Sequence, residues 1–155
     1  MRLWHKDLIP FLPDDQLLGQ WRECCAIASN LATYGEPHHI LVNRLINYTI
    51  YHFWTYSLIT LRTEFVKRGY SYSDATVAHF INNLVTYCGR SNFSEIDHNR
   101  LFEGWHSTRY LQQCILNLEE KFDCGSISLQ DWFKLLNCVK SMSVLCNETY
   151  ESLFV

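Results

Sequence analysis

The 155-residue chain has no apolar run of the roughly eighteen or more residues that would span a bilayer. Its first residues also lack the apolar stretch and small-residue cleavage site of a secretory signal peptide. The seven cysteines contain no C-x-x-C pair, which argues against a zinc ribbon or a secreted disulfide framework. We therefore expect a cytoplasmic protein with reduced, mostly buried thiols, including the adjacent Cys24 and Cys25 on the core face of a helix.

Several catalytic and ligand-binding motifs are absent as well. The chain contains no P-loop, no G-x-G-x-x-G, no H-E-x-x-H and no G-x-S-x-G sequence. Its seven histidines form no helical i, i+4 pair with a carboxylate nearby. We accordingly expect no metal site and no cofactor.

Positive charge is also scarce, since 13 Lys and Arg face 16 Asp and Glu for a net charge of −3. Residues 1–70 hold seven basic and six acidic side chains, whereas residues 71–155 hold six and ten. A duplex-DNA binder normally offers a basic surface, because phosphate contacts supply much of its affinity. Composition alone thus does not indicate nucleic acid, and it places any basic surface in the first half.

Apolar residues, in contrast, are abundant at 48%, with 15% aromatic, enough to build a packed core. Apolar positions recur at three- and four-residue spacing, and no strand pattern persists. We predict an all-α, compact single-domain bundle of about four to five helices with irregular connecting loops. Asp14 is the expected N-cap of the first helix and Ser73-Asp74 caps the third. The expected helices cover residues 16–33, 49–68, 74–87, 105–122 and 128–140.

A polar face on the first predicted helix is the clearest candidate for chemistry. Gln16, Gly19, Gln20 and Glu23 fall on one side, opposite the apolar stripe. Glycine inside a helix costs about 1 kcal/mol relative to alanine, so Gly19 suggests a need for space. It indicates either a cleft on this face or the close crossing of another helix.

Three stretches together resemble one protein family. The first is Leu8-Ile9-Pro10-x-Leu12-Pro13-x-x-Gln16-Leu17-Leu18, followed at residues 22 and 23 by Arg-Glu. The second is Leu61-Arg62-x-x-Phe65-Val66-Lys67-Arg68-Gly69-Tyr70-x-x-x-Asp74, and the third is Leu118-Glu119-Glu120-Lys121-Phe122. In order and spacing they are similar to segments of the pyrimidine-dimer DNA glycosylases of the bacteriophage endonuclease V type. The resemblance covers about two-thirds of residues 1–155 and implies a single helical domain, with residues from about 125 forming a divergent C-terminal helical extension.

The resemblance implies a glycosylase and abasic-site lyase that works through its N-terminal amine. In the family this amine attacks C1′ of the damaged nucleotide, expels the base and leaves a Schiff base, after which β-elimination cuts the strand. An α-amine is suited to this, since such groups titrate near pH ~7.7–8.0 and are partly neutral in the cell. The matching catalytic residues are Met1, which we expect to be retained before the large Arg2, and Glu23 as the carboxylate that stabilises the cationic sugar and moves protons.

Further residues would hold the DNA. By the same resemblance Arg2 and Arg22 match arginines that contact phosphate or the lesion, and Lys121 matches a lysine at the DNA-facing surface. Gln16 and Gln20 share the face of Glu23 and are candidate substrate contacts. The expected partner is double-stranded DNA with a base lesion, such as a cyclobutane pyrimidine dimer. The chain departs from the family at Gln16, Ala26 and Asn117, where a histidine and two arginines are replaced.

Two other functions remain compatible with the sequence. One is a non-catalytic helical module that keeps the fold and binds nucleic acid or protein. The other is an enzyme that breaks the glycosidic bond of a free nucleoside or of RNA and so needs no basic surface. A Met1 nitrogen well beyond about 6 Å from the Glu23 carboxylate would favour the non-catalytic module, because imine chemistry needs near-contact positioning. The sequence leaves the lesion and the oligomeric state open.

Overall fold

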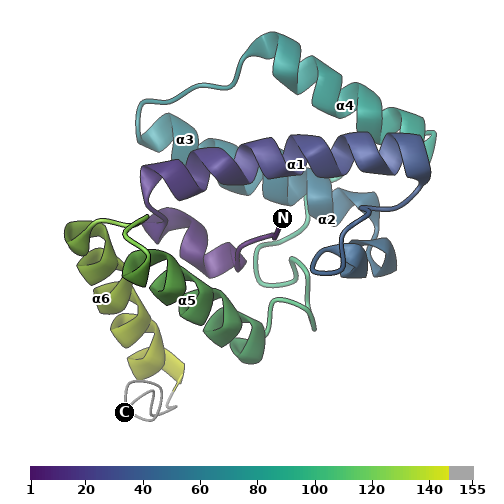
Figure 1. Ribbon diagram of the computed structural model, residues 1–155. Helices are drawn as coiled ribbons and strands as arrows, with labels where there is room; N and C mark the ends of the chain where they lie inside the picture. Colours follow the sequence, from purple (N-terminus) through teal and green to yellow (C-terminus); the bar gives the residue numbers. More distant parts are fainter. Residues whose placement is uncertain (147–155) are drawn as a thin grey trace.

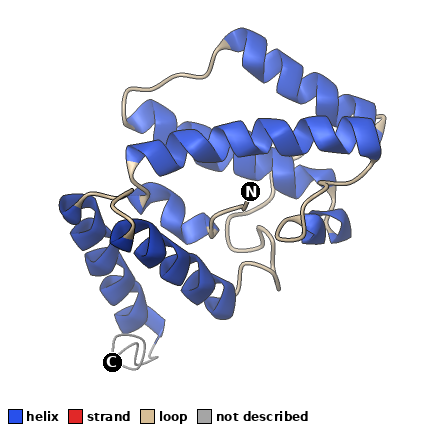
Figure 2. Cartoon of the chain, viewed as in Figure 1, coloured by secondary structure: helices blue, strands red, loops and turns tan. Residues whose placement is uncertain are grey.

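Helices connected by loops make up the computed structural model of the protein, which describes residues 1–146. No strand occurs in that part of the chain, so the predicted all-α fold is confirmed (Figure 2). Five long helical stretches are present, because α2, η3 and α3 follow one another without a break. No described helix is long and apolar enough to cross a membrane. The elements are η1 (Lys6–Phe11), α1 (Asp14–Tyr34), η2 (Asn43–Asn47), α2 (Ile50–Trp54), η3 (Thr55–Thr60), α3 (Leu61–Lys67), α4 (Asp74–Cys88), α5 (Thr108–Asp123) and α6 (Leu129–Cys146).

Helix α1 is the longest element and crosses the centre of the molecule (Figure 1). Its buried face follows the predicted apolar stripe, although Cys25 is only half-buried beside the fully buried Cys24. The prediction of Asp14 as N-cap is wrong: Pro13 is the capping position, and Asp14 is the first helical residue. The Asp14 carboxylate instead binds Arg68 and Tyr70, at 2.8 and 2.9 Å. The carboxylate that was expected to cap the helix is thus bound by two side chains that are distant in sequence.

The second long helix runs over residues 50–67, close to the predicted 49–68, but it is not a regular α-helix. Its middle, η3, is a π-helical segment in which Thr55, Tyr56, Ser57 and Leu58 are all buried. Four consecutive buried positions span every side of a helix, so this segment is covered all round, unlike an amphipathic surface helix. The hydrophobic pattern predicted the helix and gave no sign of the π segment.

Helices α4, α5 and α6 follow the predicted order with shifted boundaries. Ser73 caps α4 as expected, through a hydrogen bond from the Thr76 N–H. The expected start of α5 at Trp105 is wrong, because α5 begins at Thr108 after the Ser107 cap. Trp105 and His106 lie at the end of the preceding loop, and both side chains are buried. Helix α6 extends to residue 146 instead of about 140 and packs against α5 and η1.

Arg68 joins η1 to α1 and α3. Its guanidinium lies 2.7 Å from Glu64 and 2.8 Å from Asp14, and it donates at 2.6 Å to the Leu12 carbonyl and at 3.1 Å to that of Pro10. A planar guanidinium with five N–H donors can hold several acceptors at once, which an ammonium cannot. The Lys67-Arg68 pair at the end of α3 therefore includes a structural clamp that fixes the first segment of the chain.

A second cation, Lys6, holds the long loop of residues 89–107 against η1. Its ammonium is buried and donates to the carbonyl oxygens of His98, Asn99 and Leu101. Burial lowers the pKa of the lysine from its ordinary value. The backbone N–H of Lys6 also donates at 3.0 Å to Nδ1 of His106, so loop and η1 are joined at two points.

Candidate active site

The first four residues of the chain run in an extended path along the polar face of α1. The Arg2 N–H donates to Oε2 of Glu23 at 3.1 Å, and the Gln20 side-chain amide donates to the Arg2 carbonyl at 2.8 Å. Further along, the Trp4 N–H donates to Oε1 of Gln20 at 2.7 Å. The backbone of the terminal segment is thus held on α1 by hydrogen bonds to the side chains of Gln20 and Glu23.

This arrangement brings the chain's amino group to Glu23. The Met1 nitrogen lies 3.7 Å from Oε1 of Glu23. This is well inside the limit of about 6 Å beyond which the non-catalytic module would be favoured. The two side chains are 21% and 37% exposed, so the pair is shielded on one side and open to solvent on the other. The carboxylate can accept a proton from the amine, and a positive charge that develops beside it is stabilised.

Gln20 is held in turn by the core. It is 1% exposed, and the Tyr56 hydroxyl lies 3.1 Å from its Oε1 and 2.8 Å from the Trp4 carbonyl oxygen. Burial raises the pKa of Tyr56 well above its ordinary value, so this hydroxyl stays protonated as a donor. Tyr110 on α5 donates to the Leu3 carbonyl and fixes the segment from the other side.

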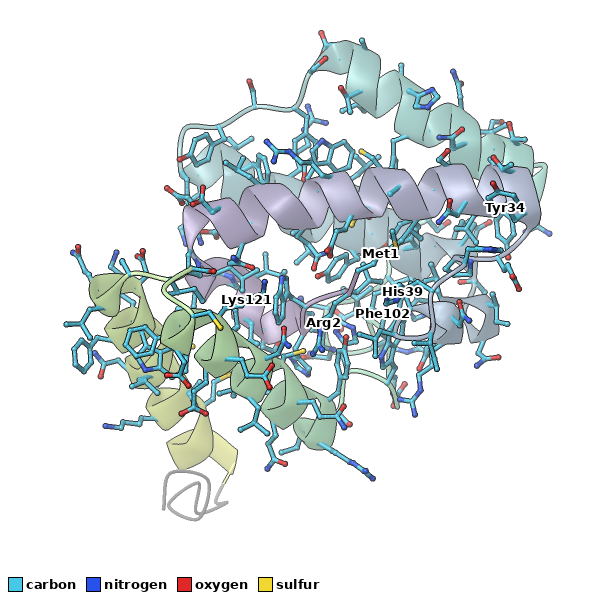
Figure 3. The ribbon with its side chains drawn as sticks, in the orientation of Figure 1. Met1, Arg2, Tyr34, His39, Phe102 and Lys121 are labelled. Atoms are coloured by element: carbon cyan, nitrogen blue, oxygen red, sulfur yellow. The ribbon has the colours of Figure 1, made fainter. Side chains whose placement is uncertain are left out.

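The amine and carboxylate open into a cleft of about 230 Å³ between α1 and α5. In Figure 3, Met1 and Arg2 lie below α1, and Lys121 projects from α5 beside them. A Cβ added at Gly19 would meet nothing within 4 Å, so the glycine leaves open space, and no helix crosses there. The cleft interpretation of this residue is thereby favoured over the crossing. The lining residues are Met1, Arg2, Trp4, Gln16, Gly19, Gln20, Glu23, Leu41, Asn117 and Lys121.

Six of the seven residues proposed for the site from sequence therefore line one cleft. Arg22 is the exception: it is exposed on α1 and is not among the described residues that line the cleft. One residue along an α-helix is a rotation of about 100°, which turns Arg22 away from the face of Glu23. Arg2, by contrast, has its guanidinium 5.4 Å from the Trp4 ring centre at the cleft wall.

Sequence reasoning missed four contributors. Tyr56 and Tyr110 act on the terminal segment through contacts that span 36 to 107 residues, which no local pattern announces. Leu41 lines the cleft from a turn without periodicity. Asn117 could have been found, since it lies four residues before Lys121 and therefore on the same face of α5.

Candidate metal ligands were sought throughout the described residues. The described residues contain no group of three or more His, Cys, Asp or Glu side chains placed to hold a metal ion. The polar groups that line the cleft are an amine, a carboxylate, side-chain amides and two cationic side chains.

Comparison with protein families finds one match, between residues 1–76 and the family described as pyrimidine dimer DNA glycosylase. The match covers a little under half of the chain and supports the resemblance to that family. No curated protein and no solved structure matches the chain. The glycosylase match contains the amine, Glu23 and every proposed site residue except Lys121.

The pyrimidine dimer DNA glycosylase match ends before α5, and so before Leu118-Glu119-Glu120-Lys121-Phe122. The first two resembling segments lie within the matched range, and the third lies outside it. The wall of the cleft that carries Asn117 and Lys121 is therefore formed by chain beyond the matched residues.

Proposed function

We propose that this protein is a DNA repair glycosylase with abasic-site lyase activity, and that it excises a damaged pyrimidine through a Schiff base on the Met1 amine. The observation that carries the proposal is the 3.7 Å separation between the Met1 nitrogen and the Glu23 carboxylate, inside a cleft that is open to solvent. The match of residues 1–76 to the glycosylase family supports it.

The proposed reaction begins with the neutral amine. Its lone pair attacks C1′ of the nucleotide, the N-glycosidic bond breaks, and the base leaves with the bonding electrons and takes up a proton. Glu23 takes one proton from the ammonium that the attack forms, and a proton is returned to O4′ as the C1′–O4′ bond breaks and the sugar ring opens, which gives the protonated imine. The imine acidifies the C2′ proton, and its removal expels the 3′ phosphate oxygen and cuts the strand. Glu23 stabilises the cationic species because its carboxylate is held beside the nitrogen.

The shape of the site favours a polymer over a free nucleoside. Pockets that engulf a small molecule usually measure about 300–1,000 Å³ and bury most of its surface. The present cleft, at about 230 Å³, has room for the reacting part of a substrate whose remainder lies outside. This argues against an enzyme for free nucleosides and suits one nucleotide of a strand.

Borohydride trapping on a duplex with one abasic site provides the test. We expect a covalent protein–DNA adduct with the wild type, and at least a hundred-fold less with Glu23→Gln, which is isosteric and can still accept from the Arg2 N–H. The matched control is Glu95→Gln, in an exposed loop position, which should trap like the wild type. Mass spectrometry of the adduct should place the modification on the α-amine of Met1.

Two results would contradict the proposal. Absence of any adduct with the wild type on both abasic and dimer-containing duplexes would leave the non-catalytic binding module as the better account. An adduct on a lysine side chain would contradict the assignment to Met1. A parallel assay on intact dimer-containing DNA determines whether base excision accompanies strand cleavage.

A further inference from the structure

A groove beside the cleft is lined by two arginines and several apolar and aromatic residues. It measures about 420 Å³ and lies between the 39–44 segment and the beginning of α5. Arg44 and Arg109 are exposed in it, and none of its described lining residues is acidic. Glu103 is the nearest carboxylate in sequence, and its backbone carbonyl is bound by Tyr48. The lining residues are Ile40, Leu41, Arg44, Gly104, Trp105, Ser107, Arg109, Tyr110 and Gln113.

Groove and cleft adjoin each other. Leu41 lines both of them. Tyr110 lines the groove, and its hydroxyl donates to the backbone of Leu3 in the segment that carries the Met1 amine. A chain-like ligand that places one unit in the cleft would therefore have its next units in the groove.

Charge is concentrated along this path. Cleft and groove together hold four cationic side chains, of Arg2, Lys121, Arg44 and Arg109, against one carboxylate, that of Glu23. The chain as a whole has 13 basic and 16 acidic residues, so the remainder has nine against fifteen. The local excess of positive charge in an acidic protein matches a polyanion that lies along the groove.

An apolar side chain stands at the edge of the groove. Ile40 is 84% exposed, the most exposed of the large apolar residues in the described part of the chain. The turn that presents it is well fixed: His39 N–H donates at 3.1 Å to the Asn43 side chain, and Val42 N–H donates at 3.0 Å to the His39 carbonyl. Val42 itself is fully buried and anchors the turn. The exposure of Ile40 is thus imposed by a supported backbone.

We propose that this groove binds the backbone of the DNA strand next to the nucleotide in the cleft, with Arg44 and Arg109 on phosphates and Ile40 inserted between neighbouring bases. Enzymes that act on a base inside a duplex must move the nucleotide out of the stack. Apolar side chains inserted between base steps unstack them and kink the duplex. The inference rests on the proposed function, for which it names the surface that grips and opens the duplex.

Salt-dependent binding tests the phosphate contacts. The probe is a fluorescein-labelled duplex with a central tetrahydrofuran abasic analogue, which cannot form an imine. Each phosphate contact contributes about 0.9 to the slope of log affinity against log salt concentration. Arg44→Gln with Arg109→Gln should lower that slope by about 2 and weaken binding at least ten-fold. The control, Arg62→Gln with Arg90→Gln, removes the same charge at exposed positions outside cleft and groove and should change the slope by less than about half as much.

Equal losses in the two double variants, or no binding by the wild type, would overturn the inference. Trapping separates this failure from failure of the proposed function. Trapping by the wild type tests the lyase by itself, because the adduct depends on the Met1 amine and Glu23, which lie in the cleft. A wild type that traps DNA while the groove variant binds normally refutes the groove alone. A wild type that never traps, with binding lost only in the groove variant, refutes the lyase alone.

Insertion of Ile40 is tested with 2-aminopurine placed beside the abasic analogue. The wild type should raise its fluorescence on binding, because the base loses its stacking neighbour, and Ile40→Ser should abolish the rise. Leu129→Ser on α6 is the matched control, since Leu129 is 60% exposed and lines neither cleft nor groove. A full fluorescence rise with Ile40→Ser would refute the insertion.

Discussion

Gln20 is a fully buried amide whose donors and acceptor are all engaged at the terminal segment. Its NH₂ group donates to the Arg2 carbonyl and lies 3.4 Å from Oε2 of Glu23, while its oxygen accepts from the Trp4 N–H. We infer that Gln20 is a positioning residue, which acts by holding the amine and the carboxylate at a fixed separation. A direct substrate contact is the weaker interpretation, because little of the side chain is accessible.

Replacement of Gln20 by alanine should therefore affect geometry and stability together. The Trp4 N–H and the Arg2 carbonyl lose their partner, and an unsatisfied buried polar group costs about 1–3 kcal/mol. We expect the free energy of unfolding to fall by that amount in urea titrations, and trapping yield to fall at least ten-fold under conditions where the variant is folded. Gln130→Ala, at an exposed position of α6, should alter neither measurement.

Substitutions at Gly19 test the cleft by adding side-chain volume to it. A methyl group meets nothing there, and alanine is favoured over glycine in a helix by about 1 kcal/mol, so Gly19→Ala should raise the free energy of unfolding by that amount. Gly19→Leu should fold as well but fill the cleft, and we expect it to lower trapping on abasic duplex at least ten-fold. Equal trapping by the leucine variant would show that substrate does not enter beside Gly19.

At the scale of elements, the clamp of Arg68 decides where η1 sits on α1 and α3. Glu64 is 8% exposed and depends on the guanidinium, 2.7 Å away, as its main counter-charge. Asp14 shares the same arginine, which holds the pKa of that exposed carboxyl below its ordinary value. Loss of the arginine leaves Glu64 with Lys67, 4.0 Å away, and removes donors from two carbonyls of the η1 region.

We expect Arg68→Ala to lower the free energy of unfolding by about 3 kcal/mol, the cost of breaking a largely buried ion pair. Arg68→Lys should recover only part of this loss, because an ammonium cannot reproduce the fork that binds Glu64 and Asp14 together. Thermal and urea unfolding measure the effect, with Arg62→Ala as the exposed arginine control. A loss below about 0.5 kcal/mol, the range of ordinary surface changes, would contradict the clamp.

For the whole molecule, two buried histidines tie stability to pH. His106 is 8% exposed, its Nδ1 accepts from the Lys6 N–H, and its Nε2 has no partner within the described structure. Burial holds the pKa of His106 well below its ordinary value of 6.5, and burial also lowers that of His5, 3% exposed, whose ring stacks on it. Both therefore bind a proton less readily in the folded chain than in the unfolded chain.

The direction of the pH effect follows from proton uptake. Below about pH 6.5 the unfolded chain binds protons at these two histidines more readily than the folded chain does. Stability is thus fully present above about pH 6.5 and falls as the pH decreases, by about 1.4 kcal/mol per pH unit for each proton. We expect His106→Gln to reduce the slope of unfolding free energy between pH 6.5 and 5.5 by about one proton, and the exposed control His79→Gln to leave it unchanged. Identical slopes in all three proteins would contradict the assignment.

Whole-molecule charge also looks different once the fold is known. The net charge of −3 argued against DNA because a sum over the sequence assumes an even distribution. The fold gathers Arg2, Lys121, Arg44 and Arg109 around one cleft and its adjoining groove, although they are spread over more than a hundred residues of sequence. Binding depends on the local arrangement, which composition does not contain.

The sequence by itself determined the helical class, the positions of the five long helical stretches and the polar face of α1. These depend on interactions within a few residues: apolar periodicity, the Ser73 cap and the spacing of Gln16, Gly19, Gln20 and Glu23 on one helix. The two segments that carry the family resemblance within residues 1–76 are likewise local, and the family match confirmed them.

Only the tertiary structure decided which polar groups meet. Capping chemistry predicted Asp14 as an N-cap, yet Arg68 lies 54 residues away and binds it more effectively. Glu23 was recognised as a candidate, but its approach to the Met1 amine depends on Gln20, Tyr56 and Tyr110 holding the terminal segment. Such contacts form between residues that are far apart in the chain, because packing of the core brings them together, and no periodicity records them.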